Sequence, residues 1–410
     1  MPRSRSATAP PLLASLSWPR PLALASRPTR RASSMDSGSK MGTSYPSPLD
    51  VARHYVAHTV SSRRFRAFIV VLGLVLIART ISSFDLVHLP HAPGAGRPAS
   101  PDAGVAHMLP INVFDNDEKT WKTIQNTGEL DLHIEPRSNF ALITWNVDFA
   151  SPEPENRIDA ALSYLRSLLV SGGPGKPDAI SPAIIVLQEI NHGMVKSLAE
   201  SEWVQRNFYV TDISTDAGIW TKSHYGTVTL VDRRIPVKAV IRLHYDSDFN
   251  RDCLFVDVEA ASSHTSQSVT VRIGNTHLES LVPATPMRLN QMKLAARFVL
   301  HDSNVYTGLI AGDMNPIDPF DAYLPVEVGL KDAYLEGGGK EESAAGHTWG
   351  YQEAGESPYP KRRFDKILYA PGERMTIEQV AVIGVGQKTT KQPEVFISDH
   401  FGVFGNVRIW

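Results

Sequence analysis

Six short polar motifs interrupt a series of apolar, strand-like runs in the C-terminal two-thirds of this 410-residue chain. They are TWN (144–146), LQE (187–189), NTHLES (275–280), GDMN (312–315), RFDK (363–366) and SDH (398–400). A rigid sheet can aim side chains from several strand ends at one point, so this order predicts one shared site. Its amides, carboxylates and imidazoles indicate metal-assisted phosphodiester chemistry.

The apolar runs also predict the fold class. Helices are expected at 157–170, near 194–203 and from residue 286 onward, with Thr285 as the N-cap of the last one. Strands are expected near 140–144, 183–187, 217–221, 225–231, 236–243, 252–259, 268–276, 306–311, 364–369, 376–383 and 401–409. So many short strands with flanking helices predict an α/β fold, a four-layer α/β/β/α sandwich over residues 137–410.

Charge divides the chain into two parts. Residues 1–100 contain 13 Lys and Arg but 3 Asp and Glu, a net charge of +10, whereas the rest of the chain has a net charge of −12. We predict a disordered basic extension over residues 1–62, although residues 1–34 also fit a mitochondrial transit peptide. The negative C-terminal part argues against a broad polyanion-binding surface, so any nucleic acid would be held locally by a metal and a few basic side chains.

An apolar segment occupies residues 63–87. Its unbroken core of 12 residues, 67–78, is shorter than the roughly 20 residues that cross a bilayer. A helix of spanning length would have to continue past Arg79 to Leu86, so a membrane anchor at residues 67–86 and a segment that does not span both remain open. Residues 88–136, rich in Pro and Gly at their start, are predicted to be a linker and lead-in.

The metal site is expected around Glu189. This residue closes a fully apolar strand, where an ionised carboxylate is costly without a partner. Mg²⁺ prefers one or two carboxylates together with water and substrate oxygens, so Glu189 with Asn146 or Asp399 is chemically sufficient, and Mn²⁺ is the expected substitute. Zinc is disfavoured because no group of His and Cys ligands is present. The lone Cys253 excludes an intramolecular disulfide and is interpreted as a buried structural thiol.

Acid–base and phosphate-contacting groups complete the predicted site. Asp313 can orient an attacking water while Asn315 donates to a phosphate oxygen, and Asp365 can orient a histidine ring or a ligand. The predicted catalytic residues are Asn146, His277, Asp313, Asn315, Asp365, Asp399 and His400. The predicted substrate-binding residues are Trp145, Ser280, Arg288, Arg363 and Phe401. Each motif alone is more often a turn, a cap or a core residue, and only their joint order at successive strand ends favours a site.

The series resembles the endonuclease/exonuclease/phosphatase superfamily, most closely the 5′-tyrosyl-DNA phosphodiesterases, from about Ala141 to the C-terminus. The resemblance implies the α/β/β/α sandwich and Mg²⁺-dependent hydrolysis with Glu189 on the metal. It also implies Asn146, Asp313 and Asn315 at the centre, with His277, Asp399 and His400 stabilising the phosphate. The chain departs from the pattern at three places. The family has one arginine where this chain has Leu281-Val282 and another where it has Ile317, and Phe401 replaces a Trp.

Two functions therefore compete. The leading hypothesis is a DNA-repair phosphodiesterase that processes single-stranded or end-frayed DNA carrying a 5′ adduct, in the nucleus or the mitochondrion. The alternative is a membrane-associated phosphodiesterase or phosphatase that acts on a phospholipid or phosphoinositide head group and is anchored through residues 67–86. A pseudoenzyme used as a binding module would require a broken site, and no central residue is missing. The sequence indicates no protein partner.

Overall fold

The structure is a computed structural model that describes residues 100, 102–125, 127–130, 134–170, 182–213, 223–352 and 360–410. The predicted basic extension, the apolar segment 67–86 and the strand expected near 217–221 lie outside these residues. Among the described residues, no helix is both long and apolar enough to span a bilayer. Leu89–Trp410 form one compact unit.

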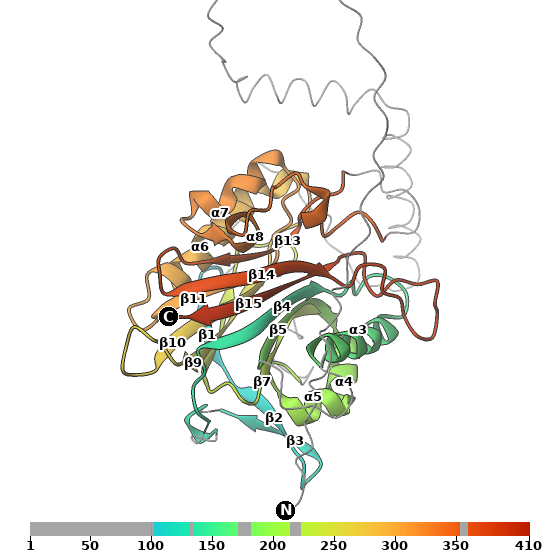
Figure 1. Cartoon of the computed structure of the whole chain (residues 1–410). Helices are drawn as coiled ribbons and strands as arrows, with labels where there is room; N and C mark the ends of the chain where they lie inside the picture. The colour runs from blue at the N-terminus through green and yellow to red at the C-terminus, as the bar shows by residue number, and fades with distance from the viewer. Residues whose placement is uncertain are drawn as a thin grey trace, which may run out of the picture. The chain divides into compact units, whose positions relative to one another are not determined.

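Two mixed sheets form the centre of the described part of the chain (Figure 1). The first has the strand order β1-β8-β9-β10-β11-β13-β12. Its strands are β1 Ala106–Leu109, β8 Val237–His244, β9 Asp252–Ala260, β10 Val269–His277, β11 Thr307–Asp313, β12 Lys331–Asp332 and β13 Asp365–Tyr369. The second has the order β14-β15-β4-β5-β7-β6-β2-β3. Its strands are β2 Ile111–Asp115, β3 Thr120–Ile124, β4 Asn139–Asn146, β5 Ala183–Asn191, β6 Phe208–Val210, β7 Tyr225–Asp232, β14 Met375–Ile383 and β15 Gly402–Ile409.

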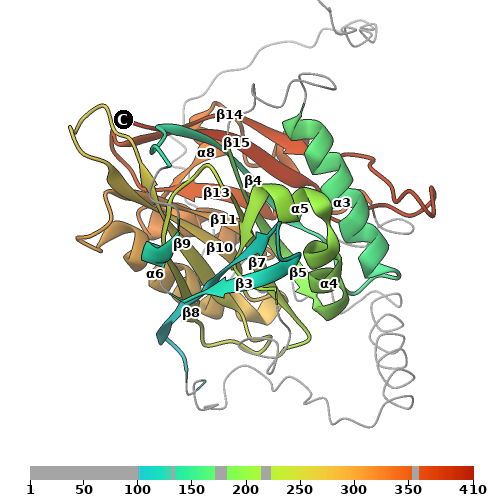
Figure 2. The same cartoon turned by 90° about the horizontal axis from the view of Figure 1, so that it is seen from below.

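Helices cover the outer face of each sheet. The helices α3 Pro154–Leu169, α4 His192–Glu200 and α5 Glu202–Asn207 lie beside the second sheet, as the view from below shows (Figure 2). The helices α6 Thr285–Leu300, α7 Leu324–Glu327 and α8 Ala333–Glu336 lie on the opposite side of the molecule (Figure 1). The four layers of the predicted α/β/β/α sandwich are therefore confirmed.

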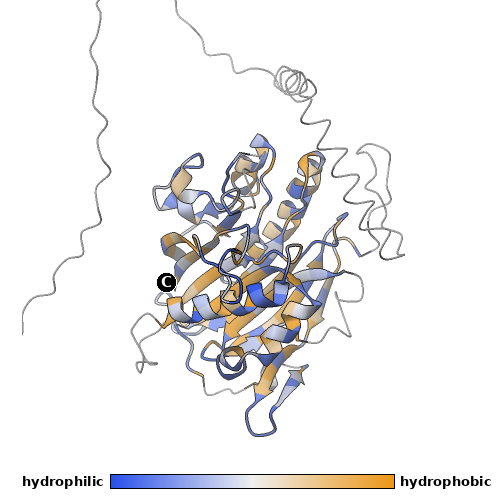
Figure 3. Cartoon of the chain, turned by 90° about the vertical axis from the view of Figure 1, so that its right-hand side faces the viewer, coloured by the Kyte–Doolittle hydropathy of each residue, from blue (hydrophilic) through white to orange (hydrophobic). Residues whose placement is uncertain are grey.

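Successive side chains of a strand point to opposite faces, so each strand supplies residues to both faces of its sheet. In β4, Leu142 packs between the sheets against residues such as Val256, whereas its neighbours Ile143 and Trp145 pack outward against α3. The outer face of the first sheet has its own cluster, in which Phe255 packs with Met292 and other residues of α6. The strands accordingly carry the apolar colour in the hydropathy view (Figure 3). Buried Cys253 belongs to this outer cluster, which confirms its structural interpretation.

The predicted lead-in at 88–136 is wrong as a linker, because it contains three strands. β1 pairs with β8 in the first sheet, and the β2–β3 hairpin extends the second sheet through β6. All three strands are short, and β1 and β3 are exposed or half-buried throughout, so they lack the long apolar run that marks a buried strand in a sequence. Two helix predictions also need correction: Ser201 breaks the helix expected near 194–203, and Ala284, not Thr285, is the N-cap of α6.

Candidate active site

Two parallel strand pairs, one in each sheet, bring the polar motifs together. In the second sheet β4 runs parallel to β5, with Asn146 opposite Gln188. In the first sheet β10 runs parallel to β11, with His277 opposite Asp313, and Asp313 in turn lies opposite Asp365 of β13. Strand ends far apart in the sequence are thus placed side by side by register.

A buried amide network joins the two sheets directly beneath the site. The Gln188 Nε2 amide of β5 donates to Asn275 Oδ1 of β10 at 2.8 Å. The Asn275 amide donates back across the interface to the carbonyl oxygens of Leu187 and Val228, at 3.1 and 3.0 Å. Both side chains are fully buried, so each amide would be costly without these partners. The network fixes the spacing between Glu189 and His277, which follow these residues on their strands.

Glu189 lies in a β-bulge rather than at the strand end expected from the sequence. β5 continues to Asn191, and its register with β7 shifts between Leu187 and Ile190. Glu189 has a φ of 59°, a left-handed conformation uncommon for a residue with a side chain. Bulges of this kind redirect a side chain, and here the carboxylate accepts from Asn146 Nδ2 at 3.2 Å and from the Phe149 amide at 3.3 Å.

Asp313 is the point on which the strand ends converge. Its Oδ2 accepts from Asn146 Nδ2 at 3.1 Å and lies 3.3 Å from His277 Nε2 and 3.7 Å from His400 Nε2. Its Oδ1 accepts from the Asn315 backbone amide at 2.9 Å. Because the ends of β4 and β10 and the segments around Asn315 and His400 contribute these groups, the Asp313 carboxylate has a single defined orientation.

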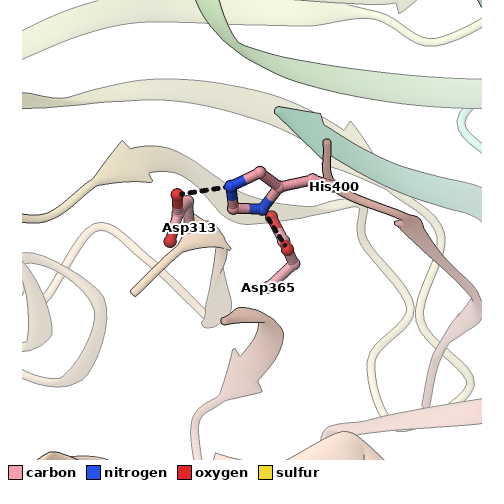
Figure 4. A group of neighbouring side chains, drawn as sticks. All are labelled: Asp313, Asp365 and His400. Atoms are coloured by element: carbon pink, nitrogen blue, oxygen red, sulfur yellow. Dashed lines mark hydrogen bonds and ion pairs between the residues drawn. The ribbon is translucent and has the colours of Figure 1, made fainter. Parts of the chain in front are cut away.

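His400 lies between two carboxylates, as the close-up shows (Figure 4). Its Nδ1 is 2.8 Å from Asp365 Oδ2, and its Nε2 faces Asp313. Burial works against a charged ring, but the negative charges of Asp365, Asp399 and Asp313 together raise the pKa of His400 well above its usual value. The His400 ring is therefore held as an imidazolium, which can donate from Nε2.

His277 has the opposite electrostatic character. Burial and the positive charge of Arg251 hold the pKa of His277 well below its usual value, so this ring is neutral. Arg251 Nη1 lies 2.6 Å from His277 Nδ1, and an arginine can only donate. The single ring proton of His277 is therefore placed on Nε2, facing Asp313.

Arg251 was not predicted from the sequence. It precedes β9 as one basic residue in a polar turn, and no spacing relates it to the motifs. In the structure it is buried, its guanidinium lies 5.2 Å from the centre of the Tyr225 ring, and its Nε has no hydrogen-bond partner. It lines a small cavity of about 10 Å³, together with Tyr225, Phe249 and His277. An unpaired buried guanidinium N–H beside the site is a ready donor for one anionic oxygen.

The acidic residues fit a divalent cation. Burial and the negative charge of Asp399 raise the pKa of Glu189 to about 7, and the same two causes raise the pKa of Asp148. Asp399 Oδ2 accepts from Trp349 Nε1 at 3.0 Å. Carboxylates that disfavour one another's ionised form are stabilised by a bound cation, and oxygen ligands are those that Mg²⁺ prefers. Asp313, Asp365 and His400 also lie close enough together to hold an ion, although the hydrogen bond between Asp365 and His400 already engages one atom of each.

The structure corrects three of the predicted substrate-binding residues. Trp145 is fully buried, and its Nε1 donates to the His400 carbonyl oxygen at 3.1 Å, so it positions His400 rather than meeting a substrate. Arg363 is buried with Asp332 and Glu341 as ion-pair partners. Arg288 is fully buried and paired with Asp321 at 2.7 Å. A buried charge needs a partner, and these two arginines have theirs inside the protein.

The remaining predicted residues lie near the site with local contacts. The Asn315 amide donates to the Leu278 carbonyl oxygen at 3.0 Å, which ties the loops after β10 and β11 together. Ser280 is half-buried in the first of these loops. Phe401 is buried and stacks on Tyr351 with 5.5 Å between ring centres. The Asn315 side chain therefore connects the two loops in this structure, and its role toward a phosphate stays a prediction.

Replacing Arg288 by Met is expected to destabilise the protein by about 3–5 kcal/mol, because Asp321 would be left as a buried, unpaired carboxylate. One oxygen of Asp321, Oδ1, already has no hydrogen-bond partner. Urea unfolding measures the change. The double variant Arg288→Met/Asp321→Leu removes both charges and should recover much of the lost stability. A double variant less stable than the single one would contradict the assignment.

Comparison with known proteins places this geometry in a family. Residues 143–400 match the model of the Endonuclease/Exonuclease/phosphatase family. TDP2 from D. rerio complexed with a single-strand DNA product is 20% identical, with a TM-score of 0.51 over 66% of this chain and 99% of that one. A D. rerio TDP2 humanized by 14 mutations is 21% identical (TM-score 0.50, 66% and 99%), and truncated TDP2 from Caenorhabditis elegans is 19% identical (0.50, 66% and 98%). These likenesses concern the fold. No curated protein sequence matches the chain significantly.

Proposed function

This chain belongs to the endonuclease/exonuclease/phosphatase family of metal-dependent phosphodiesterases and nucleases, and we propose that it hydrolyses a phosphodiester at a DNA 5′ end that carries an adduct, with Mg²⁺ as the cofactor. The observation that carries the proposal is the convergence of Asn146, His277 and His400 on Asp313 Oδ2, with Glu189 Oε1 accepting from the same Asn146 Nδ2. A reaction that adds water to a phosphoryl group needs these groups in one place.

Glu189, Asn146 and Asp399 are the residues proposed to hold the metal, which would neutralise charge on the phosphoryl oxygens. Asp313 is the proposed acceptor that orients the attacking water, because three donors fix its carboxylate. The His400 imidazolium, which Asp365 orients, is proposed to donate to a phosphoryl oxygen. His277 presents its Nε2–H to the same region. Each proposed role is supported by the charge and the hydrogen-bond partners of the residue concerned.

Arg251 extends this proposal to substrate binding. Replacement by Ala is expected to lower kcat/KM by about 10- to 100-fold, since a charge-assisted hydrogen bond contributes about 1.5–3 kcal/mol. Replacement by Lys keeps the charge and should recover part of the loss. Steady-state kinetics on the wild type and both variants provides the measurement.

The control for Arg251 is Arg206→Ala in α5, where an exposed arginine pairs with Glu202. This variant should keep full activity. Equal activity of Arg251→Ala and the wild type would mean that Arg251 only packs beneath the site.

DNA is the proposed substrate because the D. rerio TDP2 structure, which shares this fold, contains a single-strand DNA product. A DNA-repair role, and with it a nuclear or mitochondrial location, rests on this substrate. One observation favours the second candidate, a phospholipid or phosphoinositide head group. Large apolar side chains, among them Leu281 and Phe320, are exposed on the loops that follow the catalytic strands.

The test is cleavage by the full-length protein of a 5′-phosphotyrosyl oligonucleotide and, separately, of phospholipid vesicles. Mg²⁺ should support cleavage of the oligonucleotide, and EDTA should abolish it. Cleavage of the lipid alone would reverse the ranking of the two substrates. Absence of cleavage of either substrate with Mg²⁺ or Mn²⁺ would overturn the proposed activity.

A further inference from the structure

The exposed large apolar side chains of the described residues are unevenly distributed. Five of the nine lie on the loops that follow β10 and β11, with 51–75% of each side chain exposed. We call these five residues the apolar rim: Leu281, Val282, Phe320, Tyr323 and Val326. Scattered single apolar residues are normal on a protein surface, whereas a group of this kind usually marks a contact surface.

The two loops of the apolar rim are joined into one surface by Arg288. Its Nη1 donates to the Leu281 carbonyl oxygen at 2.8 Å, and its Nη2 donates to Asp321 Oδ2 at 2.7 Å. Phe320 and Tyr323 lie three residues apart in a 3₁₀ helix, Pro319–Tyr323, and Val326 follows at the same spacing in α7. This spacing aligns side chains on one face, so the second loop presents its apolar residues together.

Leu281 is held in an unfavourable conformation on this surface. Its φ of 73° and ψ of 152° lie in a region that glycine adopts far more readily, and such a residue costs about 1–3 kcal/mol. The protein nevertheless keeps a half-exposed leucine there and fixes its carbonyl group with a buried arginine. Strain of this kind persists where surrounding structure enforces it, often at contact sites.

The apolar rim lies beside the proposed active site. Leu281 is four residues after His277, and Phe320 is five residues after Asn315, whose amide donates to the Leu278 carbonyl oxygen. Two arginines lie near the rim: Arg288 is buried and paired with Asp321, and Arg362 donates from Nη1 to the Pro316 carbonyl oxygen at 3.2 Å. The charge of Arg288 is therefore neutralised inside the protein, and this arginine is not available to a polyanion.

We propose that the apolar rim docks the active site on the surface of a zwitterionic phospholipid bilayer. Phe320 and Tyr323 are aromatic residues of the kind found at membrane interfaces, and the aliphatic rim residues supply apolar area. The net charge of −12 beyond residue 100 disfavours contact between this part of the chain and an anionic membrane, so docking of the apolar rim would depend on apolar contact.

The sequence before the described part supports a bilayer over a second copy of the chain. The apolar segment for which a membrane anchor remains open ends at Leu86, and the described part begins at Ser100. An extended chain covers at most about 3.6 Å per residue, so a bound segment would keep the catalytic unit within roughly 50 Å of the bilayer. The rim docking does not depend on which phosphodiester is cleaved, because it concerns the surface around the site.

A single fluorescent label can test the docking in the full-length protein. Cys253 is the one cysteine of the chain and is buried, so an introduced exposed cysteine is labelled selectively. Val326→Cys carries an environment-sensitive fluorophore on the rim. Ser266→Cys is the matched control, in the exposed β9–β10 loop. This loop precedes β10, whereas the rim follows it, and nine residues of strand at about 3.3 Å each separate the two ends.

With phosphatidylcholine vesicles we expect a blue shift and protection from a water-soluble quencher at position 326 and neither change at position 266. Phe320→Asp should lower the docked-to-undocked ratio reported at position 326 by about tenfold or more, since it removes an aromatic side chain that docking would bury in the bilayer. Met108→Asp, on an exposed apolar residue of β1, should leave that ratio unchanged.

Other outcomes overturn the docking proposal. The first two are no shift of the fluorophore's emission at position 326 and an equal shift at positions 326 and 266. The third is a shift without vesicles that grows with protein concentration, and the fourth is a shift produced by an oligonucleotide alone. The third would identify a second copy as the occupant, and the fourth would identify DNA. None of these readouts requires turnover, so failure of the docking and failure of the proposed hydrolysis are distinguishable.

Discussion

Replacing Glu189 by Gln should reduce kcat by at least about 10²-fold and leave the melting temperature in EDTA nearly unchanged. Groups that merely support a metal ligand contribute 10–100-fold to metal affinity or activity, and a direct ligand is expected to contribute more. The fold should tolerate Gln because burial and Asp399 already raise the pKa of Glu189 to about 7, so the neutral form is nearly as favourable as the charged one.

Metal binding gives this prediction a second readout. A ligand at 100 times its Kd stabilises the native state by about 2.7 kcal/mol, so Mg²⁺ should raise the melting temperature of the wild type. The Glu189→Gln variant should lose that rise, whereas Glu202→Gln, an exposed glutamate of α5, should keep it. A Glu189→Gln protein that retains both the rise and full turnover would remove Glu189 from the metal site.

Replacing Gly312 by Ala should destabilise the protein by more than about 3 kcal/mol and disable the site. Gly312 has a φ of 149°, and an added Cβ would lie 1.8 Å from the Thr276 carbonyl oxygen. Strands β10 and β11 pair at this position, so the clash would separate His277 from Asp313. Urea unfolding and turnover measured on the same preparation test both consequences.

Gly372→Ala is the matched control for the clash. Gly372 also has a positive φ, 116°, but an added Cβ there would meet no atom within 4 Å. Its cost should be limited to the backbone strain of about 1–2 kcal/mol, with turnover preserved. If both glycine variants lose the same stability, the backbone conformation rather than the contact with β10 explains the effect of Gly312→Ala.

The predicted strands that carry the motifs were identified from the sequence because they are fully buried. Runs such as residues 183–187 are apolar on both faces, since one face packs between the sheets and the other under a helix. The β2–β3 hairpin gave no comparable signal. Its edge strand β3 is exposed or half-buried throughout, and β2 pairs with β6 through Asn112 and Val210, which are 98 residues apart.

The amino-acid sequence by itself determined the family, the sandwich fold and the identity of the polar groups at the strand ends, because hydrophobic period and motif order are local properties. Only the tertiary structure decided which charged residues are available. Arg288 and Arg363 are indistinguishable from substrate-binding arginines in a sequence, and burial with Asp321 and Asp332 engages them inside the protein. Arg251 gained its place beside His277 because β9, which follows Arg251, pairs antiparallel with β10, and Glu189 gained its direction from a bulge. Such contacts join residues far apart in the chain, so no local pattern encodes them.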